Sequence, residues 1–310
     1  MEYRQLGKSG IKVSALSFGS WITFGGNLDL QGVRRCMRAA YENGVNFFDN
    51  AEAYAHGASE FLMGEALKEY HRQDLVISTK IFWGGRGIND TGLSWKHLVE
   101  GTKQSLRRMN LEYVDLLYCH RPDPLTPIEE TVRAIDVLIK QGIVFYWGTS
   151  EWKASEIEAA YEIAYGINAT PPSMEQPEYN LFKRDRVEKE YAPLYAKYGL
   201  GITSWSPLDS GILTGKYNQG IPEKSRLHQH QELRNHLTEE KIARVRNLEK
   251  ISKELGCSLS QLALAWCLKN ENVSSVITGA SHPDQVEENM HAISIKDQLT
   301  DEVIHLIEAC

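Results

Sequence analysis

The sequence predicts an α/β fold, a closed (β/α)₈ or TIM barrel, from three observations. Eight short runs rich in β-branched and aromatic residues occur along the 310 residues. Most of them begin roughly 30 to 40 residues apart, which leaves room for a strand, a helix and two short loops. The runs are nearly continuously apolar, as is typical of parallel strands that helices cover on both faces.

The eight expected strands can be placed by number, and stretches with helical spacing of apolar residues separate most of them. One such stretch carries Val33, Met37 and Ala40, and another carries Leu98 and Leu106. The strands are expected at residues 13–20, 46–49, 75–80, 114–120, 143–150, 173–176, 201–207 and 274–280.

Two segments depart from the regular spacing. Residues 3–13 contain a Gly-Lys-Ser-Gly turn at 7–10, which predicts a β-hairpin that precedes the barrel and caps its bottom. The interval between strands seven and eight is extended: it holds a polar loop, 208–235, and an extra helix, 238–255, capped by Thr238. Long loops on the carboxyl face of a barrel usually serve a ligand. We expect residues 1–310 to form one barrel domain.

Composition and charge exclude several classes of function. The formal net charge of −7 comes from 41 acidic and 34 basic residues without a basic block, which argues against a nucleic-acid partner. No apolar run approaches the roughly 18 residues needed to span a bilayer, and the first residues lack the apolar core of a signal peptide. We therefore expect a cytoplasmic protein without membrane insertion.

Cysteine and histidine positions do not favour a metal centre. The five cysteines lie far apart and form no Cys-x-x-Cys pair, so neither a disulfide framework nor a zinc site is expected. His228 and His230 lie in a polar stretch, where a solvated loop is the better interpretation because metal sites need three or four convergent ligands.

Four polar residues lie at or just after the ends of expected strands. Asp49, Lys80 and His120 end strands two, three and four, and Tyr54 follows in the loop after strand two. The carboxyl ends of barrel strands meet on one face, so these side chains are expected to converge. An ammonium group lowers the pKa of a neighbouring phenol, and a carboxylate compensates a buried lysine. The group can therefore protonate a carbonyl oxygen while a cofactor delivers a hydride.

Each of these residues also has a structural explanation when it is taken alone. Asp49 can cap a turn, Lys80 can belong to a structural ion pair, Tyr54 can pack on the rim, and His120 can be a hydrogen-bonded core histidine. A different chemistry also follows from Lys80, which could form a Schiff base as in an aldolase-type barrel. The combination of four complementary groups favours the acid/base site.

These residues resemble the Asp, Tyr, Lys, His tetrad of the aldo-keto reductases. The resemblance rests on residues 48–54 with Lys80 and His120, and it extends from Leu6 to Asn289 through residues 118–124, 146–150 and 205–208. Residues 80–85, 211–217 and 256–257 are similar, more narrowly, to the branch that contains the voltage-gated potassium channel β-subunits.

The resemblance implies an NADPH-dependent reductase of aldehydes and ketones, with Asp49, Tyr54, Lys80 and His120 as catalytic residues. It implies that NADPH (NADP⁺) binds without a doubly wound domain, which agrees with the lack of a Gly-x-Gly-x-x-Gly between a strand and a helix. The expected cofactor contacts are Trp21, Asp49, Ser150, Gln176, Trp205, Ser206, Pro207, Leu208, Ser210, Lys216, Arg226, Gly279, Ser281, Gln285, Glu288 and Asn289.

Within this set the resemblance implies separate tasks. Ser150 and Gln176 would hold the nicotinamide carboxamide, and Trp205 would stack on its ring. Ser281, with Asp284 three residues later, is also expected as a helix N-cap, where free amides can bind phosphate. For any one of these polar residues, ordinary capping or loop hydrogen bonding is the alternative.

Aromatic residues that follow the barrel strands are expected to line a substrate pocket. This pocket would consist of Trp21, Phe24, Tyr54, Phe82, Trp83 and His120, with Trp152 as a further candidate. Rigid apolar walls favour a small carbonyl substrate with an apolar body. Packing on the barrel rim is the alternative for each of them.

Two positions differ from the channel β-subunit pattern. Mammalian channel subunits have asparagine where this chain has His120, so the fuller tetrad favours turnover. They have arginine where this chain has Glu151, so one cofactor contact is in doubt and faster cofactor release is expected. The branch resemblance still implies an alternative function, an NADPH-binding regulatory subunit with slow turnover, a tetrameric assembly and a channel partner. Because the chain starts almost at the hairpin, no tethered inactivation peptide is expected.

Overall fold

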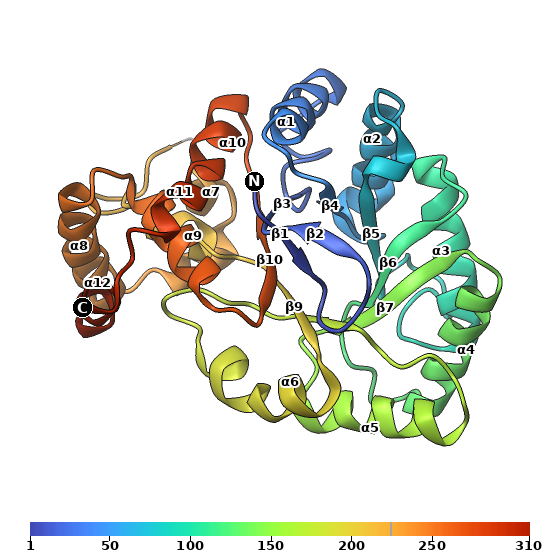
Figure 1. Ribbon diagram of the computed structural model, residues 1–310. Coiled ribbons are helices and arrows are strands. Elements are labelled where there is room, and N and C mark those ends of the chain that lie inside the picture. The colour runs from blue at the N-terminus through green and yellow to red at the C-terminus, as the bar shows by residue number, and fades with distance from the viewer. Residues whose placement is uncertain (224) are drawn as a thin grey trace.

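The computed structural model describes residues 1–223 and 225–310 and confirms the predicted (β/α)₈ barrel. Eight parallel strands close in the order β10-β3-β4-β5-β6-β7-β8-β9 (Figure 1). Their bounds are β3 Leu16–Gly19, β4 Phe47–Asp49, β5 Val76–Ile81, β6 Val114–Cys119, β7 Val144–Ser150, β8 Met174–Gln176, β9 Gly201–Ser204 and β10 Val273–Thr278.

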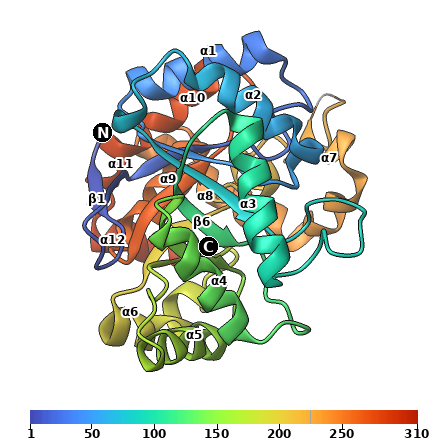
Figure 2. The same cartoon turned by 90° about the vertical axis from the view of Figure 1, so that its right-hand side faces the viewer.

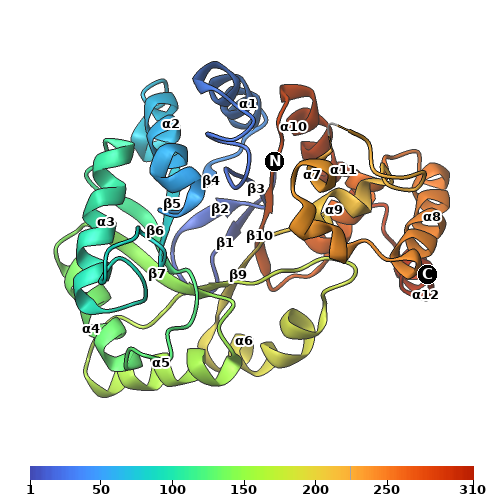
Figure 3. The ribbon, with the colours of Figure 1, turned by 180° about the vertical axis from the view of Figure 1, so that it is seen from behind.

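The hairpin is present and caps the end of the barrel where the strands begin. Its strands, β1 (Tyr3–Gln5) and β2 (Lys12–Ser14), pair antiparallel. Its contacts go to strand beginnings: the Arg4 guanidinium donates to the Val273 carbonyl at 2.7 Å, and the Lys8 amide donates to the Gly199 carbonyl at 2.9 Å. The hairpin therefore leaves the opposite, carboxyl end of the barrel free for a site (Figure 3).

The prediction of one strand over residues 13–20 was wrong at its start. Residues 12–14 belong to the hairpin, and the barrel strand begins only at Leu16. Between them the chain changes partners, because the Ala15 amide donates to the Glu2 carbonyl while the Ala15 carbonyl accepts from Val276 of β10. A continuous apolar run cannot reveal such a change of partner strand.

Helices surround the barrel on its outside. After successive strands come α1 (Leu30–Glu42), α2 (Ala58–Leu67), α3 (Trp95–Met109), α4 (Ile128–Lys140), α5 (Ala154–Gly166), α6 (Ala192–Tyr198), α9 (Leu259–Lys269) and α10 (Pro283–Met290), and then α11 (Ala292–Lys296) and α12 (Asp301–Ala309). Figure 2 shows α3, α4 and α5 one after another along the outer surface. In α1, the Asp29 side chain caps the Gly32 amide, and Val33 and Met37 are buried toward the strands. No helix among the described residues is long and apolar enough to cross a membrane.

The insertion between β9 and α9 contains more helix than predicted. The expected extra helix is α8 (Glu239–Glu254), capped by Thr238 through the Lys241 amide at 3.2 Å. The expected loop 208–235 instead contains 3₁₀ turns at Asp209–Thr214 and Gln231–His236 and the short helix α7 (Arg226–Gln229). Lys224 of this predicted loop lies outside the described residues. Short helical turns lack a periodic apolar face, so hydrophobic spacing does not reveal them.

Candidate active site

Lys80 is the centre of the predicted site. It lies one residue before the end of β5, with a fully buried side chain, and its ammonium donates to three oxygens. The acceptors are Asp49 Oδ2 at 2.5 Å, the Asn50 carbonyl at 2.8 Å and the Tyr54 hydroxyl at 3.0 Å. A lysine has three donors, so all of them are used. The fold thus brings Asp49, Tyr54 and Lys80 into direct contact.

Asp49 accepts two further hydrogen bonds that hold it in place. Ser78 donates to Asp49 Oδ1 at 2.7 Å, and the Gln176 side-chain amide donates to the same oxygen at 3.1 Å. Ser78 was not anticipated from the sequence, although it precedes Lys80 by two positions and therefore shares its side of the strand. These bonds connect the ends of β4, β5 and β8 through one carboxylate.

The charge state of the pair follows from burial and from the partners. Burial alone would lower the pKa of Lys80, but Asp49 and Tyr54 outweigh it and raise the pKa above its ordinary value, so Lys80 is an ammonium ion. Burial raises the pKa of Tyr54, which Lys80 opposes and Asp49 reinforces, and the net direction is upward. The predicted lowering of this pKa by Lys80 is therefore present but is outweighed. The desolvation of the phenolate is the larger effect, so Tyr54 keeps its proton at neutral pH.

His120 follows β6 directly and joins the same group. Its ring lies edge-on to Tyr54 at 5.8 Å and to Trp83 at 5.1 Å between centroids. Burial, and then the charges of Lys80 and Arg121, lower the pKa of His120 well below its ordinary value, so the imidazole is neutral. Its Nδ1 is buried without a hydrogen-bond partner among the described residues. A buried polar atom without a partner is uncommon in folded proteins and marks this ring as unusual.

The aromatic residues that were predicted to line a substrate pocket differ in their exposure. Trp83 is 43% exposed and packs against Phe82 at 4.8 Å, and Trp21 is 38% exposed and lies edge-on to Trp205 at 6.0 Å. Phe24, in contrast, is 1% exposed and packs on the core residue Phe18, so it offers no surface to a substrate. Trp152 is similarly buried. Both belong to the hydrophobic core rather than to an exposed wall.

The ends of β7, β8 and β9 carry the residues expected to hold a nicotinamide. The Ser150 hydroxyl donates to the Gln176 carbonyl at 2.8 Å, and Trp205 follows β9. Glu151, which was not expected to have this role, fixes the Trp205 indole by accepting its N–H at 2.9 Å. The other Glu151 oxygen pairs with Arg186. The Glu151 carboxylate is therefore committed to contacts within the protein.

Two cations of the insertion, Lys216 and Arg226, have no acidic partner in the part of the chain that the structure describes. The Lys216 ammonium lies over the Tyr217 ring at 5.2 Å, and the Arg226 guanidinium lies 5.9 Å from the Trp21 ring. Neither forms an ion pair with the described residues, while the nearby Asp209 is taken by Lys241 at 2.5 Å. Burial, and then the repulsion by Arg226, lower the pKa of Lys216. Two neighbouring cations without a carboxylate are typical of an anion-binding site.

The loop before α10 lies next to this cationic pair. A Cβ built on Gly279 would be 4.0 Å from Arg226 Nη2, so the two segments are adjacent. The prediction of Ser281 as the N-cap of α10 was wrong, because His282 is the cap and accepts from the Asp284 amide at 3.4 Å. Pro283 begins the helix one residue later than expected, since its fixed φ suits the first helical position. The Ser281 amide donates to Gln285 Oε1 at 2.9 Å instead.

The remaining predicted cofactor residues lie in the loop after β9 and on α10. Ser206 and Ser210 have left-handed backbone angles, with φ of 54° and 57°. Glu288 is exposed on α10, where its carbonyl accepts from Gln261 at 3.0 Å, and Asn289 is buried. Pro207 and Leu208 complete the loop after β9.

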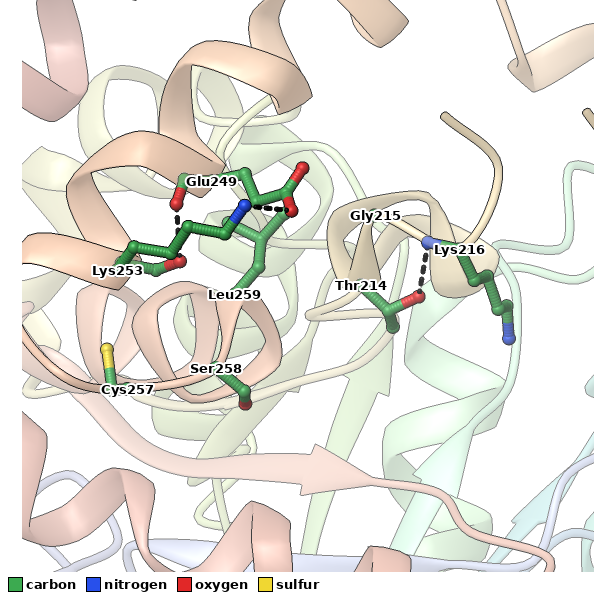
Figure 4. A pocket seen from close by; sticks show the side chains of 9 residues that line it. Thr214, Gly215, Lys216, Glu249, Lys253, Cys257, Ser258 and Leu259 are labelled. Carbon is green, nitrogen blue, oxygen red and sulfur yellow. Dashed lines mark hydrogen bonds and ion pairs between the residues drawn. The ribbon is translucent and has the colours of Figure 1, made fainter. Parts of the chain in front are cut away.

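A cavity of about 370 Å³ lies beside Lys216 and is lined by residues between β9 and α9 and by the start of α9. It is lined by Thr214, Glu249, Cys257 and other residues of the insertion, and Glu249 pairs with Lys253 at 2.8 Å (Figure 4). The Lys216 side chain points away from this ion pair (Figure 4). No member of the tetrad lines the cavity, although Lys216, one of the predicted cofactor residues, does.

A known protein family matches nearly the whole chain, including the barrel and the tetrad. The aldo/keto reductase family profile matches residues 15–310, which include all eight barrel strands and the tetrad. The chain belongs to the aldo/keto reductase family. An Arabidopsis thaliana protein named "Probable voltage-gated potassium channel subunit beta" is 54% identical over 314 aligned positions, covering 99% of this chain and 96% of its own length. An Oryza sativa subsp. japonica protein of the same name is 53% identical over 315 positions, covering 100% and 96%.

Glu175 is a buried acid beside the site that sequence reasoning missed. It lies on β8 next to Gln176 with no exposed surface, and the Thr149 hydroxyl donates to it. Burial raises the pKa of Glu175 to about 8, so the carboxyl is protonated at neutral pH. The hydrophobic pattern of a short strand predicts that a glutamate side chain faces water. The burial of Glu175 therefore could not be predicted from this pattern.

Replacing Glu175 with glutamine is expected to flatten the pH dependence of stability. The folded-state pKa is above the ordinary value of 4.5, so the stability contributed by the protonated form is fully present below pH 4.5 and is lost as the pH rises toward 8. We expect this group to account for ~1–3 kcal/mol of the fall in the free energy of unfolding over that range. Urea unfolding at pH 5, 7 and 9 measures it. The exposed Glu287→Gln is the matched control, and an unchanged pH slope in Glu175→Gln would contradict the assignment.

Proposed function

We propose that the protein is an NADPH-dependent carbonyl reductase that converts aldehydes and ketones to alcohols. The observation that supports this most strongly is the geometry of the tetrad. A protonated Tyr54 hydroxyl lies 3.0 Å from the buried ammonium of Lys80, which Asp49 holds at 2.5 Å. The neutral His120 ring lies beside them, and its buried Nδ1 has no hydrogen-bond partner among the described residues.

The four residues have different tasks in this proposal. When bound, NADPH supplies the hydride that reaches the carbonyl carbon. Tyr54 donates its proton to the carbonyl oxygen, and Lys80 stabilises the phenolate that remains. Asp49 keeps Lys80 charged and in place. His120, as a neutral imidazole, donates a hydrogen bond to the carbonyl oxygen and orients the substrate.

The chain offers groups that fit each end of NADPH. Ser150 and Gln176 suit the carboxamide, and Trp205, held by Glu151, suits the face of the nicotinamide ring. The cationic pair suits the phosphates, because no carboxylate among the described residues neutralises it. The residues proposed along the pyrophosphate and adenosine are Ser206, Pro207, Leu208, Ser210, Lys216, Arg226, Gly279, Ser281, Gln285, Glu288 and Asn289.

Replacing Arg226 with glutamine is expected to weaken NADPH binding about 10- to 100-fold, the usual effect of losing a charge-assisted bond to a phosphate. NADH lacks the phosphate on the adenosine ribose of NADPH, so its binding should be weakened much less. Fluorescence titration of both cofactors measures the two affinities. Lys250→Gln serves as control, because it removes a cation on α8 whose ammonium donates to Asn247 Oδ1 at 3.1 Å. Equal losses for the two cofactors would show that Arg226 does not distinguish them.

The reductase activity is tested by following NADPH oxidation with 4-nitrobenzaldehyde, methylglyoxal and phenanthrenequinone. Turnover of at least one of them is expected, and failure with all three would reject the proposal.

The aldolase-type alternative is disfavoured because the Lys80 ammonium is protonated and donates to three acceptors, whereas a Schiff-base lysine must be a free amine. Borohydride trapping of a carbonyl compound on Lys80 would revive it.

A second candidate function is favoured by the names of the two plant relatives. On this alternative, the barrel binds NADPH with slow turnover and docks on a channel protein from the cytoplasm, as a tetramer. Light scattering measures the mass in solution, and pull-down from membranes tests the partner. A monomer with fast turnover would contradict this alternative, and His120 already favours turnover.

A further inference from the structure

Arg121 brings a positive charge to the edge of the tetrad. It follows His120 directly, and its guanidinium donates through Nη1 to the His120 carbonyl at 2.5 Å and to Ser150 Oγ at 3.3 Å. Its Cζ also lies 5.5 Å from the centre of the Trp83 ring. Arg121 therefore sits between the end of β6, the end of β7 and the exposed aromatic wall.

No carboxylate among the described residues pairs with the Arg121 guanidinium. Other half-buried arginines have carboxylate partners, as Arg108 has in Glu60 and Arg72 has in Asp115, each at 2.6 Å. Arg121 forms no ion pair within residues 1–223 and 225–310. The nearby Asp123 is occupied by the Leu93 amide and other donors of its own loop.

Part of the Arg121 guanidinium also lacks hydrogen-bond partners. The structure gives bonds for Nη1 only, among the described residues, whereas a guanidinium carries five N–H donors in a planar fork. Such a fork matches a carboxylate through two parallel bonds. Stacking on Trp83 orients the fork without cancelling its charge.

We propose that Arg121 makes the site selective for carbonyl substrates that carry a carboxylate or similar anion beyond an apolar body. The inference rests on the proposed reductase function and names its substrate class. Tyr54 and His120 would hold the carbonyl, Trp83 and Phe82 would cover the apolar body, and the unpaired N–H groups of Arg121 would bind the anion. A purely structural Arg121, which only ties His120 to Ser150, would affect charged and neutral substrates equally.

A matched pair of aldehydes separates the two roles. The kcat/KM for 4-carboxybenzaldehyde is compared with that for 4-nitrobenzaldehyde, whose neutral nitro group has the same shape as a carboxylate. We expect Arg121→Gln to lower this ratio about 10- to 100-fold, since a hydrogen bond to a charged group contributes about 1.5–3 kcal/mol. An effect of Arg121 on Tyr54 or His120 lowers kcat/KM for both aldehydes, so it largely cancels when the ratio in the variant is compared with the ratio in the wild type.

Two further variants sharpen the result. Arg121→Lys keeps the charge but loses the fork, so it should retain only part of the preference. Arg86→Gln removes an exposed arginine from the loop after β5 and should leave the ratio unchanged, which controls for general electrostatic attraction. An unchanged ratio in Arg121→Gln, or an equal fall for both aldehydes, would overturn the inference while the reductase function stands.

The inference can still be decided if neither aldehyde is reduced, whether or not the other carbonyl compounds of the panel are turned over. Calorimetric titration then compares 4-carboxybenzyl alcohol with 4-nitrobenzyl alcohol on the protein mixed with NADP⁺. A preference for the carboxylate that disappears in Arg121→Gln supports the anion site. No preference in the wild-type protein, or one that survives in Arg121→Gln, overturns it.

Discussion

Replacing Tyr54 with phenylalanine is expected to lower kcat about 10²- to 10⁴-fold, the usual contribution of a positioned proton donor. The change removes the hydroxyl that lies 3.0 Å from Lys80 but keeps the ring that packs edge-on to His120. NADPH binding should therefore persist. A loss of kcat without a loss of cofactor affinity is the signature of an interaction that matters only in the transition state.

Steady-state NADPH oxidation with 4-nitrobenzaldehyde measures kcat, and fluorescence titration measures cofactor binding in the same variant. Tyr113→Phe is the matched control, because Tyr113 precedes β6 at the opposite end of the barrel and stacks on Phe145. Turnover in Tyr54→Phe as fast as in the wild type would show that another group supplies the proton. If this holds for every substrate tested, the catalytic role of Tyr54 is rejected.

Replacing Lys80 with methionine is expected to reduce both stability and activity. The substitution leaves the carboxylate of Asp49 buried without its ion-pair partner, which costs about 3–5 kcal/mol in the free energy of unfolding. The bonds from Ser78 and Gln176 offset only part of this cost, because neither donor is charged. The kcat should also fall by at least about 10²-fold, since the phenolate of Tyr54 loses its stabilising ammonium.

A double variant separates the two effects. Lys80→Met combined with Asp49→Asn removes both charges, so it should recover much of the stability lost in Lys80→Met without recovering turnover. Urea unfolding at pH 7 gives the stabilities of the single and double variants. Lys189→Met breaks an ion pair with Asp185 on the surface, with both side chains more than three-quarters exposed, and should cost at most about 1 kcal/mol. If the losses of the two single variants simply add in the double variant, Lys80 and Asp49 do not stabilise one another.

The barrel strands could be predicted closely because each is a short apolar run between helices. For β4 the predicted and observed ends agree at Asp49, and for β7 they agree at Ser150. The errors occur where backbone partners change without a change in composition. The partner switch at Ala15 and the delayed start of α10 at Pro283 depend on hydrogen bonds that a single segment does not reveal.

Some residues of the site could be predicted from the sequence and others could not. Asp49, Lys80 and His120 could be recognised because a polar group at the end of a buried strand is unusual. Ser78 and Glu175 could not, because each lies within such a run. Phe24 was misplaced since aromatic residues after a strand pack in the core as readily as they line a pocket. Whether a side chain is covered depends on segments that come from elsewhere in the chain.

The sequence by itself determined the barrel, the family and the chemical types of the groups at the strand ends. These follow from local apolar spacing and from residue identity, which folding does not alter. Only the tertiary structure decided the state of those groups. Burial keeps Tyr54 and Glu175 protonated, and Asp49 keeps Lys80 charged. The Arg121 guanidinium donates to a backbone carbonyl and pairs with no carboxylate among the described residues. Protonation and charge pairing depend on every atom that replaces water around a group, and those atoms come from strands far apart in the sequence.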